Sequence, residues 1–102
     1  MGKVVLITGC SSGIGLETAI ACAKEGNIVF ATVRNMNTST ELKKRIENEQ
    51  LKNIEILELD VAKTESIEVT ISTIVQKAEK IDVLFNNAGF MIMGSLEDLS
   101  MD

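Results

Sequence analysis

The sequence predicts an α/β domain built on a doubly wound parallel sheet, and three observations carry that prediction. Strand-like apolar runs alternate with stretches of helical periodicity along the 102 residues. Each strand-like run is short and largely apolar, as expected for strands that are covered on both faces. Finally, 45% of the residues are apolar and 25% are charged, which is typical of a globular protein.

The first part of the chain predicts a β-α-β unit. Residues 3–8 (KVVLIT) form a β-branched, apolar run that favours a buried strand. A helix rich in small side chains follows over residues 13–25, and Gly26 is placed to end it. Residues 27–33 (NIVFATV) predict the second strand.

A second helix is predicted over residues 39–51. Thr38 and Glu41 have the spacing of a capping box at its start. Glu41, Arg45 and Glu49 follow one another at intervals of four residues, so we expect ion pairs along its surface. Residues 54–59 (IEILEL) then predict the third strand, with Asp60 at its carboxyl end.

The last part of the chain predicts a third helix and a fourth strand. The helix begins near Thr64, and the strand covers residues 81–85 (IDVLF), followed by Asn-Asn-Ala-Gly. The residues from Ser95 look like the start of a further helix. One face of the third helix is apolar and consists of Ile67, Ile71, Ile74, Val75 and Ala78.

Together these elements predict the first four strands of a Rossmann-type sheet. Right-handed crossovers between consecutive strands give the strand order 3-2-1-4. In such a sheet ligands bind outside the carboxyl ends of the strands, where the order reverses between strands 1 and 4. The glycine-rich and polar segments of this sequence all follow the carboxyl end of a strand.

The segment between the first strand and the first helix, residues 8–15 (TGCSSGIG), indicates a phosphate-binding turn. We expect Gly9 to allow a tight turn with positive φ, Gly13 to let the backbone approach a phosphate, and Gly15 to let the helix lie close. The helix amino terminus would offer N–H groups and a partial positive charge to a pyrophosphate. A plain strand-to-helix turn is the alternative. The candidate binding residues are Gly9, Ser11, Ser12, Gly13, Ile14 and Gly15.

Two other phosphate-handling folds do not fit this loop. A P-loop is excluded, because no Gly-Lys-Ser or Gly-Lys-Thr run follows the glycines. A receiver domain is disfavoured although Asp60 is placed like a phosphoacceptor, since the glycine loop replaces the acidic pair expected after the first strand.

The end of the second strand favours NADP(H) over NAD(H). A site for NAD(H) places a carboxylate at this end, and the corresponding position, near Thr32, carries no acid. Arg34 follows two residues later, and its guanidinium could form a bidentate contact with the 2′-phosphate of NADP(H). A surface arginine near a helix start is the alternative for Arg34, and NAD(H) stays open as a second cofactor.

Three motifs, in this order and spacing, resemble the short-chain dehydrogenase/reductase family: residues 8–15, Asp60-Val61 and residues 86–89 (NNAG). The resemblance spans essentially the whole chain, and TGCSSGIG with ATVR looks most similar to the steroid and retinol dehydrogenase branch. It implies that residues 1–102 are the amino-terminal, NAD(P)-binding portion of a Rossmann domain. It also implies an oxidoreductase that moves a hydride between the nicotinamide and an alcohol or carbonyl carbon.

The same resemblance implies roles for the second and third motifs. Asp60 would contact the adenine amino group, with the Val61 backbone alongside. Asn86 is expected to tie strands together through side-chain hydrogen bonds. The residues expected beside the adenine ribose are Asn87, Ala88 and Gly89.

The sequence departs from the family at the catalytic residues. The family reaction uses a Tyr, a Lys four residues later, a Ser and a further Asn, all in the second half of the family domain. This chain has no Tyr and ends before those positions, so we assign no catalytic residue and expect the chain alone to be inactive. Our hypothesis is a truncated family domain, in which strand 4 becomes an exposed apolar edge. Such a chain would be either marginally stable or self-associating, with a homo-oligomer as one form of self-association.

Composition and charge argue against other partners. The net charge of −5 and the lack of a basic stripe disfavour nucleic acid. The chain has no His, and Cys10 and Cys22 match no zinc or redox spacing, so no metal is expected. The apolar runs are too short for a membrane span and no leader opens the sequence, so we expect a cytoplasmic protein. Cys10 is interpreted as a small, space-filling side chain, with a reactive thiol as the alternative.

The sequence is consistent with two functions. The first is the cofactor half of an NADP(H)-dependent oxidoreductase for a small alcohol or carbonyl substrate. The second is a non-catalytic dinucleotide-binding module or an inactive truncated family member. The sequence beyond Asp102 discriminates between them, because only the enzyme requires a Ser followed by Tyr-x-x-x-Lys. A purely structural role explains none of the loop chemistry.

Overall fold

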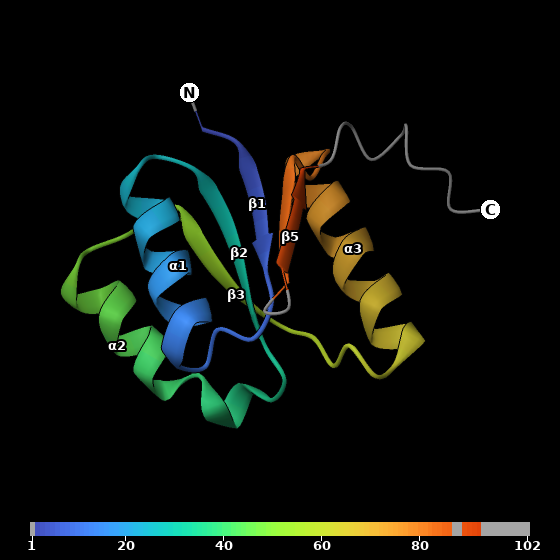
Figure 1. Cartoon of the computed structure of the whole chain (residues 1–102), viewed down its shortest axis with the longest axis horizontal. Coiled ribbons are helices and arrows are strands. Elements are labelled where there is room, and N and C mark those ends of the chain that lie inside the picture. The colour runs from blue at the N-terminus through green and yellow to red at the C-terminus, as the bar shows by residue number, and fades with distance from the viewer. Residues whose placement is uncertain (1, 87–88, 93–102) are drawn as a thin grey trace.

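Strands and helices alternate along the chain (Figure 1), and the computed structural model describes residues 2–86 and 89–92. The alternation predicted from the sequence is confirmed as far as the fourth strand. The elements are β1 (Val4–Ile7), α1 (Gly13–Lys24), β2 (Ile28–Val33), the short 3-10 helix η1 (Met36–Thr38), α2 (Thr40–Asn48), β3 (Ile54–Glu58), α3 (Thr64–Ala78), β4 (Val83–Asn86) and β5 (Gly89–Ile92).

The sheet has the strand order β3-β2-β1-β4-β5. β1 pairs in parallel with both β2 and β4, and β2 pairs in parallel with β3. The predicted order 3-2-1-4 is therefore confirmed. β1 lies at the centre because all four of its residues are apolar and buried, so it can be covered on both faces.

The fifth strand was not predicted, and it changes the edge of the sheet. β5 runs antiparallel to β4, and Asn86 is paired with Gly89. The expectation that strand 4 forms the exposed edge is wrong, because β5 lies along its outer side and pairs with its backbone. The further helix expected from Ser95 lies outside the described residues.

Helices cover both faces of the sheet. In Figure 1, α1 and α2 lie on one side of the strands and α3 lies on the other. Side chains of β1 alternate between these two layers, as a pleated strand requires. Val5 and Ile7 pack with α1 and with Leu42 of α2, whereas Val4 and Leu6 pack with Ile74 of α3. Burying an aliphatic side chain such as Ile74 stabilises the fold by about 1.5–3 kcal/mol.

The end of α1 follows the prediction. Gly26 has a φ of 90°, its N–H donates to the Ala23 carbonyl, and the Asn27 N–H donates to the Cys22 carbonyl. These two bonds form a Schellman motif, which satisfies carbonyl groups that the last turn leaves without partners.

The start of α2 differs from the prediction, and the capping box between Thr38 and Glu41 is wrong. The Thr38 hydroxyl donates to the Asn35 carbonyl within η1, and α2 begins only at Thr40. Local turn chemistry therefore outcompetes the cap, as it often does for Ser and Thr. Arg45 pairs with Glu49 as expected, but its other partner is Glu17 of α1 rather than Glu41.

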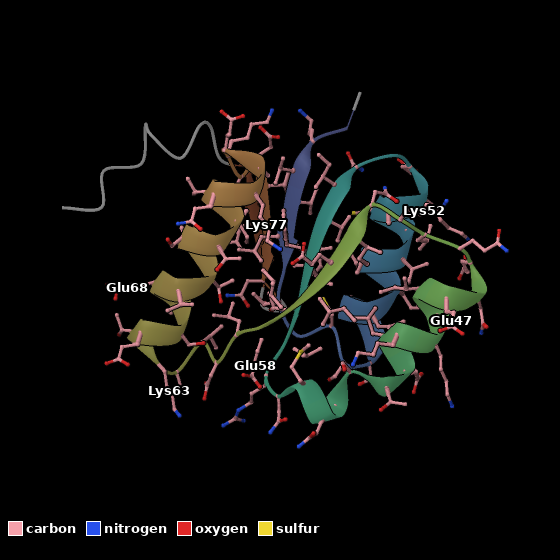
Figure 2. All side chains as sticks on the ribbon, turned by 180° about the vertical axis from the view of Figure 1, so that it is seen from behind. Glu47, Lys52, Glu58, Lys63, Glu68 and Lys77 are labelled. Atoms are coloured by element: carbon pink, nitrogen blue, oxygen red, sulfur yellow. The ribbon has the colours of Figure 1, made fainter. Side chains whose placement is uncertain are left out.

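α3 lies alongside β3, which is an edge strand of the described sheet (Figure 2). Its predicted apolar face points to the sheet, although only Ile74 of that set is fully buried. The other buried residue is Thr70, whose hydroxyl donates to the Glu58 carbonyl at 3.2 Å. Lys77 forms an ion pair with Glu55 further along the same strand. Polar side chains of α3 therefore bind the backbone and the surface of the edge strand.

Amide and carboxylate side chains join the strands at their amino ends. The Asn27 side chain accepts a hydrogen bond from the Lys3 N–H at 2.9 Å, and the Asn53 side chain donates to the Asn27 carbonyl. Asp82 accepts from the Val4 N–H at 2.8 Å, and this bond lowers the pKa of its carboxyl group. These contacts leave the opposite, carboxyl end of the sheet for other chemistry.

Candidate functional site at the carboxyl edge of the sheet

The loops that carry the sequence motifs leave the sheet at one edge. β1, β2, β3 and β4 are mutually parallel, so their carboxyl ends lie together. The glycine loop follows β1, Arg34 follows β2, and Asp60 follows β3. The topology therefore brings these predicted site residues to the same edge.

The glycine loop has the backbone geometry expected from its spacing. Gly9 and Gly13 have φ values of 68° and 63°, in a region that other residues adopt only under strain. A Cβ on Gly15 would stand 2.1 Å from the Gly9 carbonyl oxygen, so no larger residue fits there without moving the loop. The close approach predicted for Gly15 is thus to the loop and the end of β1.

The amino terminus of α1 is open toward solvent. Ser12 occupies the N-cap position, but its side chain makes no capping hydrogen bond, and the first turn carries no acidic residue. Ser12, Gly13 and Ile14 are exposed, and Ile14 retains 73% of its accessible surface. Uncapped N–H groups at a helix start have unsatisfied donors and a partial positive charge, so this end of α1 suits an anion.

Asn86 joins the two central strands at this edge, as predicted. The Thr8 hydroxyl lies 3.3 Å from the Asn86 Oδ1 and donates to it. The Thr8 N–H also donates to the Phe85 carbonyl at 2.9 Å. These bonds hold the end of β1 against the end of β4, which fixes where the glycine loop begins.

Cys10 is part of the core, so the space-filling interpretation is confirmed over the reactive thiol. Its side chain has no accessible surface, and its Sγ donates to the Ile7 carbonyl at 3.3 Å. Burial raises the pKa of the thiol to about 12, although a hydrogen bond from the Thr32 backbone lowers it in part. A thiol in this state is protonated and inert at neutral pH.

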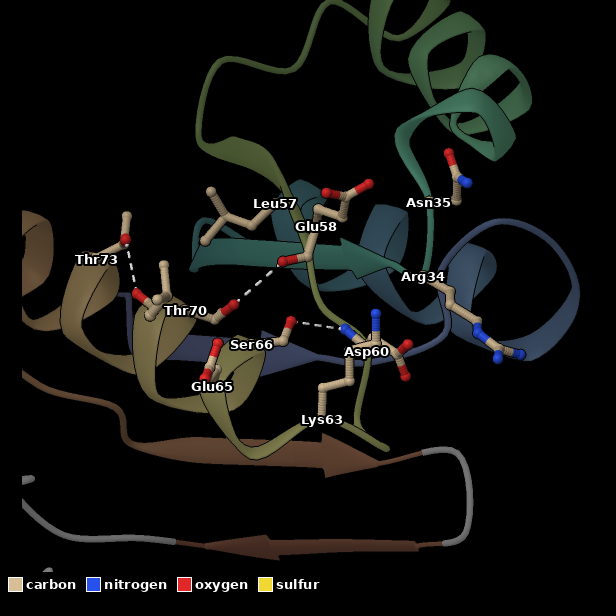
Figure 3. Close-up of a pocket in the computed structure, with 11 residues that line it drawn as sticks. Arg34, Asn35, Leu57, Glu58, Asp60, Lys63, Glu65, Ser66, Thr70 and Thr73 are labelled. Atoms are coloured by element: carbon tan, nitrogen blue, oxygen red, sulfur yellow. Dashed lines mark hydrogen bonds between the residues drawn. The ribbon is translucent and has the colours of Figure 1, made fainter.

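Arg34 is exposed at the end of β2 and lines a groove that also includes Asn35 and Asp60. Figure 3 shows Arg34 and Asp60 at one end of this groove, with Thr70 and Thr73 at the other. Thr32, the position considered for an acid, is only 1% exposed, so its side chain faces the core rather than this groove. Of the two positions, Arg34 is therefore the one that can contact a ligand.

Asp60 is held at the mouth of the groove by three hydrogen bonds. Its N–H donates to the Ser66 hydroxyl at 2.9 Å, and its carbonyl accepts from the Lys63 N–H at 2.9 Å. Its Oδ1 accepts from the Ala62 N–H at 3.0 Å. Val61 beside it is 58% exposed.

The structure describes only part of the third motif, residues 86–89. Asn87 and Ala88 lie outside the described residues, and for Gly89 the structure gives its place in β5 opposite Asn86. Their predicted position beside a ribose therefore stays a prediction.

Ser66 also lies at this edge, and it was not among the site residues predicted from the sequence. It stands in the first turn of α3, three residues after the N-cap Lys63. A side chain at that position can reach back to an N–H that precedes the helix, as in a capping box, and this spacing was the available signal. The distance to Asp60 depends on the loop conformation, which the sequence alone did not reveal.

Two features are absent from the part of the chain that the structure describes. No group of three or more His, Cys, Asp or Glu side chains comes close enough there to hold a metal ion. Among the helices described, none has both the length and the apolar character that a bilayer crossing requires.

Comparison with known proteins identifies the family. Residues 3–102 match the family model described as short chain dehydrogenase. Retinol dehydrogenase 13 of Homo sapiens is 35% identical over 91 residues, which is 88% of this chain and 28% of that protein. The NADP-dependent 3-hydroxy acid dehydrogenase of Schizosaccharomyces pombe is 37% identical over 103 residues, which is 99% of this chain and 40% of that protein.

A solved structure shows the same fold. The menthone neomenthol reductase of Mentha piperita superposes with a TM-score of 0.78 at 28% sequence identity, covering 87% of this chain and 32% of the reductase. The strand order and this superposition define a Rossmann-type α/β fold. The chain belongs to the short-chain dehydrogenase family, and it spans less than half the length of these relatives. The retinol dehydrogenase among them agrees with the branch that the motifs resemble.

Proposed function

We propose that the chain binds NADP(H) in preference to NAD(H), as the cofactor-binding part of an oxidoreductase for alcohols or carbonyl compounds. The observation that carries the proposal is the uncapped amino terminus of α1, which opens at the same edge as the exposed Arg34. One relative, the 3-hydroxy acid dehydrogenase, is described as NADP-dependent, which supports the preference.

The residues present fit a dinucleotide. N–H groups of the loop from Gly9 to Gly15 would hold the pyrophosphate, since the helix start offers donors without a competing carboxylate. Asp60 would accept from the adenine amino group, with Val61 alongside. By the same proposal, the segment from Asn87 to Gly89 would pass beside the adenine ribose.

Arg34 would distinguish the two cofactors through the 2′-phosphate, which only NADP(H) carries. A planar guanidinium can donate two parallel hydrogen bonds to a phosphate. Arg34 forms no salt bridge within the described residues, so it can turn to a ligand without breaking an ion pair.

The bound nicotinamide would supply the hydride chemistry, and the residues of this chain would hold and orient the cofactor. We propose no catalytic residue here, because the sequence contains no Tyr. We further propose that the complete enzyme works in the cytoplasm. A second candidate is a dinucleotide-binding module without catalysis. The gene sequence after Asp102 decides between the two, because only the enzyme needs a Ser and a Tyr-x-x-x-Lys motif.

The experiment is a titration of the 102-residue chain with NADPH and with NADH, followed by nicotinamide fluorescence. The wild type should bind both, with NADPH the tighter. Arg34→Glu should lose about tenfold or more of its NADPH affinity and much less of its NADH affinity, since a charge-assisted phosphate contact contributes about 1.5–3 kcal/mol.

The matched control is Lys52→Glu, which changes the net charge equally. Lys52 is exposed and precedes β3 at the amino end of the sheet, far from the loops of the site. It should leave both affinities unchanged. Equal losses for NADPH and NADH in Arg34→Glu would overturn the role of Arg34, and equal affinities of the wild type would overturn the NADP(H) preference. No binding of either cofactor would overturn the site itself.

A further inference from the structure

Ser66 and Asp60 form a contact that links α3 to the candidate adenine position. The Asp60 N–H donates to the Ser66 Oγ at 2.9 Å, across the loop that separates β3 from α3 (Figure 3). Ser66 is half-buried and lines the same groove as Asp60 and Arg34. The hydroxyl therefore fixes the backbone from which the Asp60 side chain projects.

The Asp60 carboxylate is itself held on one side only. Its Oδ1 accepts from the Ala62 N–H, while no hydrogen bond or ion pair to its Oδ2 occurs among the residues that the structure describes. A carboxylate oriented by one oxygen presents the other in a defined direction. At the mouth of the groove, that oxygen is an acceptor for a ligand N–H group.

From this geometry we infer that Ser66 is a positioning residue, which holds Asp60 so that its carboxylate selects a purine with an exocyclic amino group. The inference rests on the proposed function, in which Asp60 contacts adenine. Adenine presents an N–H donor at C6, and hypoxanthine presents a carbonyl oxygen there. A fixed carboxylate accepts from the first and repels the second, because both partners would then be acceptors.

A role limited to starting α3 would give a different result. If Ser66 only stabilised the helix, its loss would weaken every dinucleotide equally. If it positions Asp60, its loss would reduce the preference for adenine over hypoxanthine. The ratio of the two affinities therefore separates positioning from general stability.

The experiment measures the dissociation constants of NADPH and of its analogue in which hypoxanthine replaces adenine, by nicotinamide fluorescence on the 102-residue chain. The wild type should prefer NADPH by roughly tenfold, as expected for a hydrogen bond to a charged group. Ser66→Ala should reduce that ratio by about threefold or more. Ser66→Cys keeps the size of the side chain but accepts poorly, so it should behave in the same way if the alanine variant does not fold.

Two further variants serve as a control and as a test of the carboxylate. Thr73→Val removes another hydroxyl from the same helix and groove, one that donates within α3 to the Val69 carbonyl, and it should keep the wild-type ratio. Asp60→Asn supplies an amide that can donate to hypoxanthine, so it should reduce or reverse the preference.

An unchanged ratio in both Ser66 variants, with a clear preference in the wild type, would overturn the role of Ser66 and leave the proposed function intact. Equal wild-type affinities for the two cofactors would show that Asp60 does not recognise the adenine amino group. A wild type that binds neither cofactor would instead show that the proposed function is wrong.

Discussion

Cys10 shows two opposing effects on a single residue. It lies two residues before the N-cap of α1, and a helix amino terminus ordinarily stabilises a thiolate. Its side chain is nevertheless fully buried beneath the loop, and burial dominates, so the pKa of the thiol rises to about 12. Desolvation of the charged form outweighs the helix dipole here. The residue contributes packing, and its ionisation would have to be accompanied by opening of the loop.

This shift predicts a loss of stability in alkali. Because the pKa of Cys10 is higher in the folded state, near 12, than the ordinary 9.0, its contribution is fully present below pH 9 and is lost as pH rises toward 12. Between pH 8 and pH 10 the wild type should lose about 1.4 kcal/mol more of its free energy of unfolding than Cys10→Ala does. Urea unfolding at the two pH values measures this, and parallel losses in both proteins would contradict it.

At the residue scale, the sequence predicted backbone requirements better than side-chain partners. The positive φ of Gly9 and the crowding at Gly15 follow from the glycine spacing, because only glycine meets those constraints. The hydrogen bond between Asp60 and Ser66 does not follow from spacing. It requires the loop after β3 to return its backbone to the first turn of α3, which is a property of the folded chain.

At the scale of the element, α3 stabilises an edge strand through polar contacts. Thr70 is 3% exposed, and its hydroxyl satisfies the Glu58 carbonyl at the end of β3. Thr70→Val keeps the shape and removes the donor, leaving that carbonyl without its partner. We expect a loss of about 1 kcal/mol in the free energy of unfolding, measured by urea denaturation.

The control for that measurement is Thr73→Val, one turn further along α3. The Thr73 hydroxyl donates to the Val69 carbonyl of its own helix near the surface, where water can replace it. Its loss should cost less than about 0.5 kcal/mol. Similar losses in both variants would show that the contact with β3 contributes nothing specific.

The short elements and the element boundaries were predicted less well from the sequence than the long strands and helices. The long strands and helices were predicted because their apolar periodicity is strong. η1 was missed because the side chains of Asn35, Thr38 and Ser39 bond to backbone groups two or three residues away, which competes with a regular helix start. β5 was missed because the strand has only four residues and the sequence before it lacks a typical hairpin pair such as Asn-Gly.

At the scale of the whole molecule, binding and stability are linked. A cofactor that binds only the folded chain stabilises it, by about 2.7 kcal/mol when present at one hundred times its dissociation constant. NADPH should therefore raise the urea midpoint of the wild type, and the same concentration should raise that of Arg34→Glu much less. An equal rise in both proteins would contradict a role for Arg34.

The mass in solution belongs beside that measurement, because self-association also shifts apparent stability. β3 and β5 are the outer strands of the described sheet, and an edge strand presents backbone groups that a second chain can pair with. We predict that the average mass rises with protein concentration. A constant monomeric mass would contradict this, and it would also make the unfolding data simpler to interpret.

The amino ends of the strands are joined by Asn27, Asn53 and Asp82, while the loops of the candidate site leave from the other end. These three side chains are therefore distinct from the residues that would select a cofactor. In evolutionary terms the two tasks are separable, because substitutions in the loops can accumulate while the scaffold keeps its register. A library that randomises Arg34 and its neighbours could thus explore new cofactor preferences with few unfolded members.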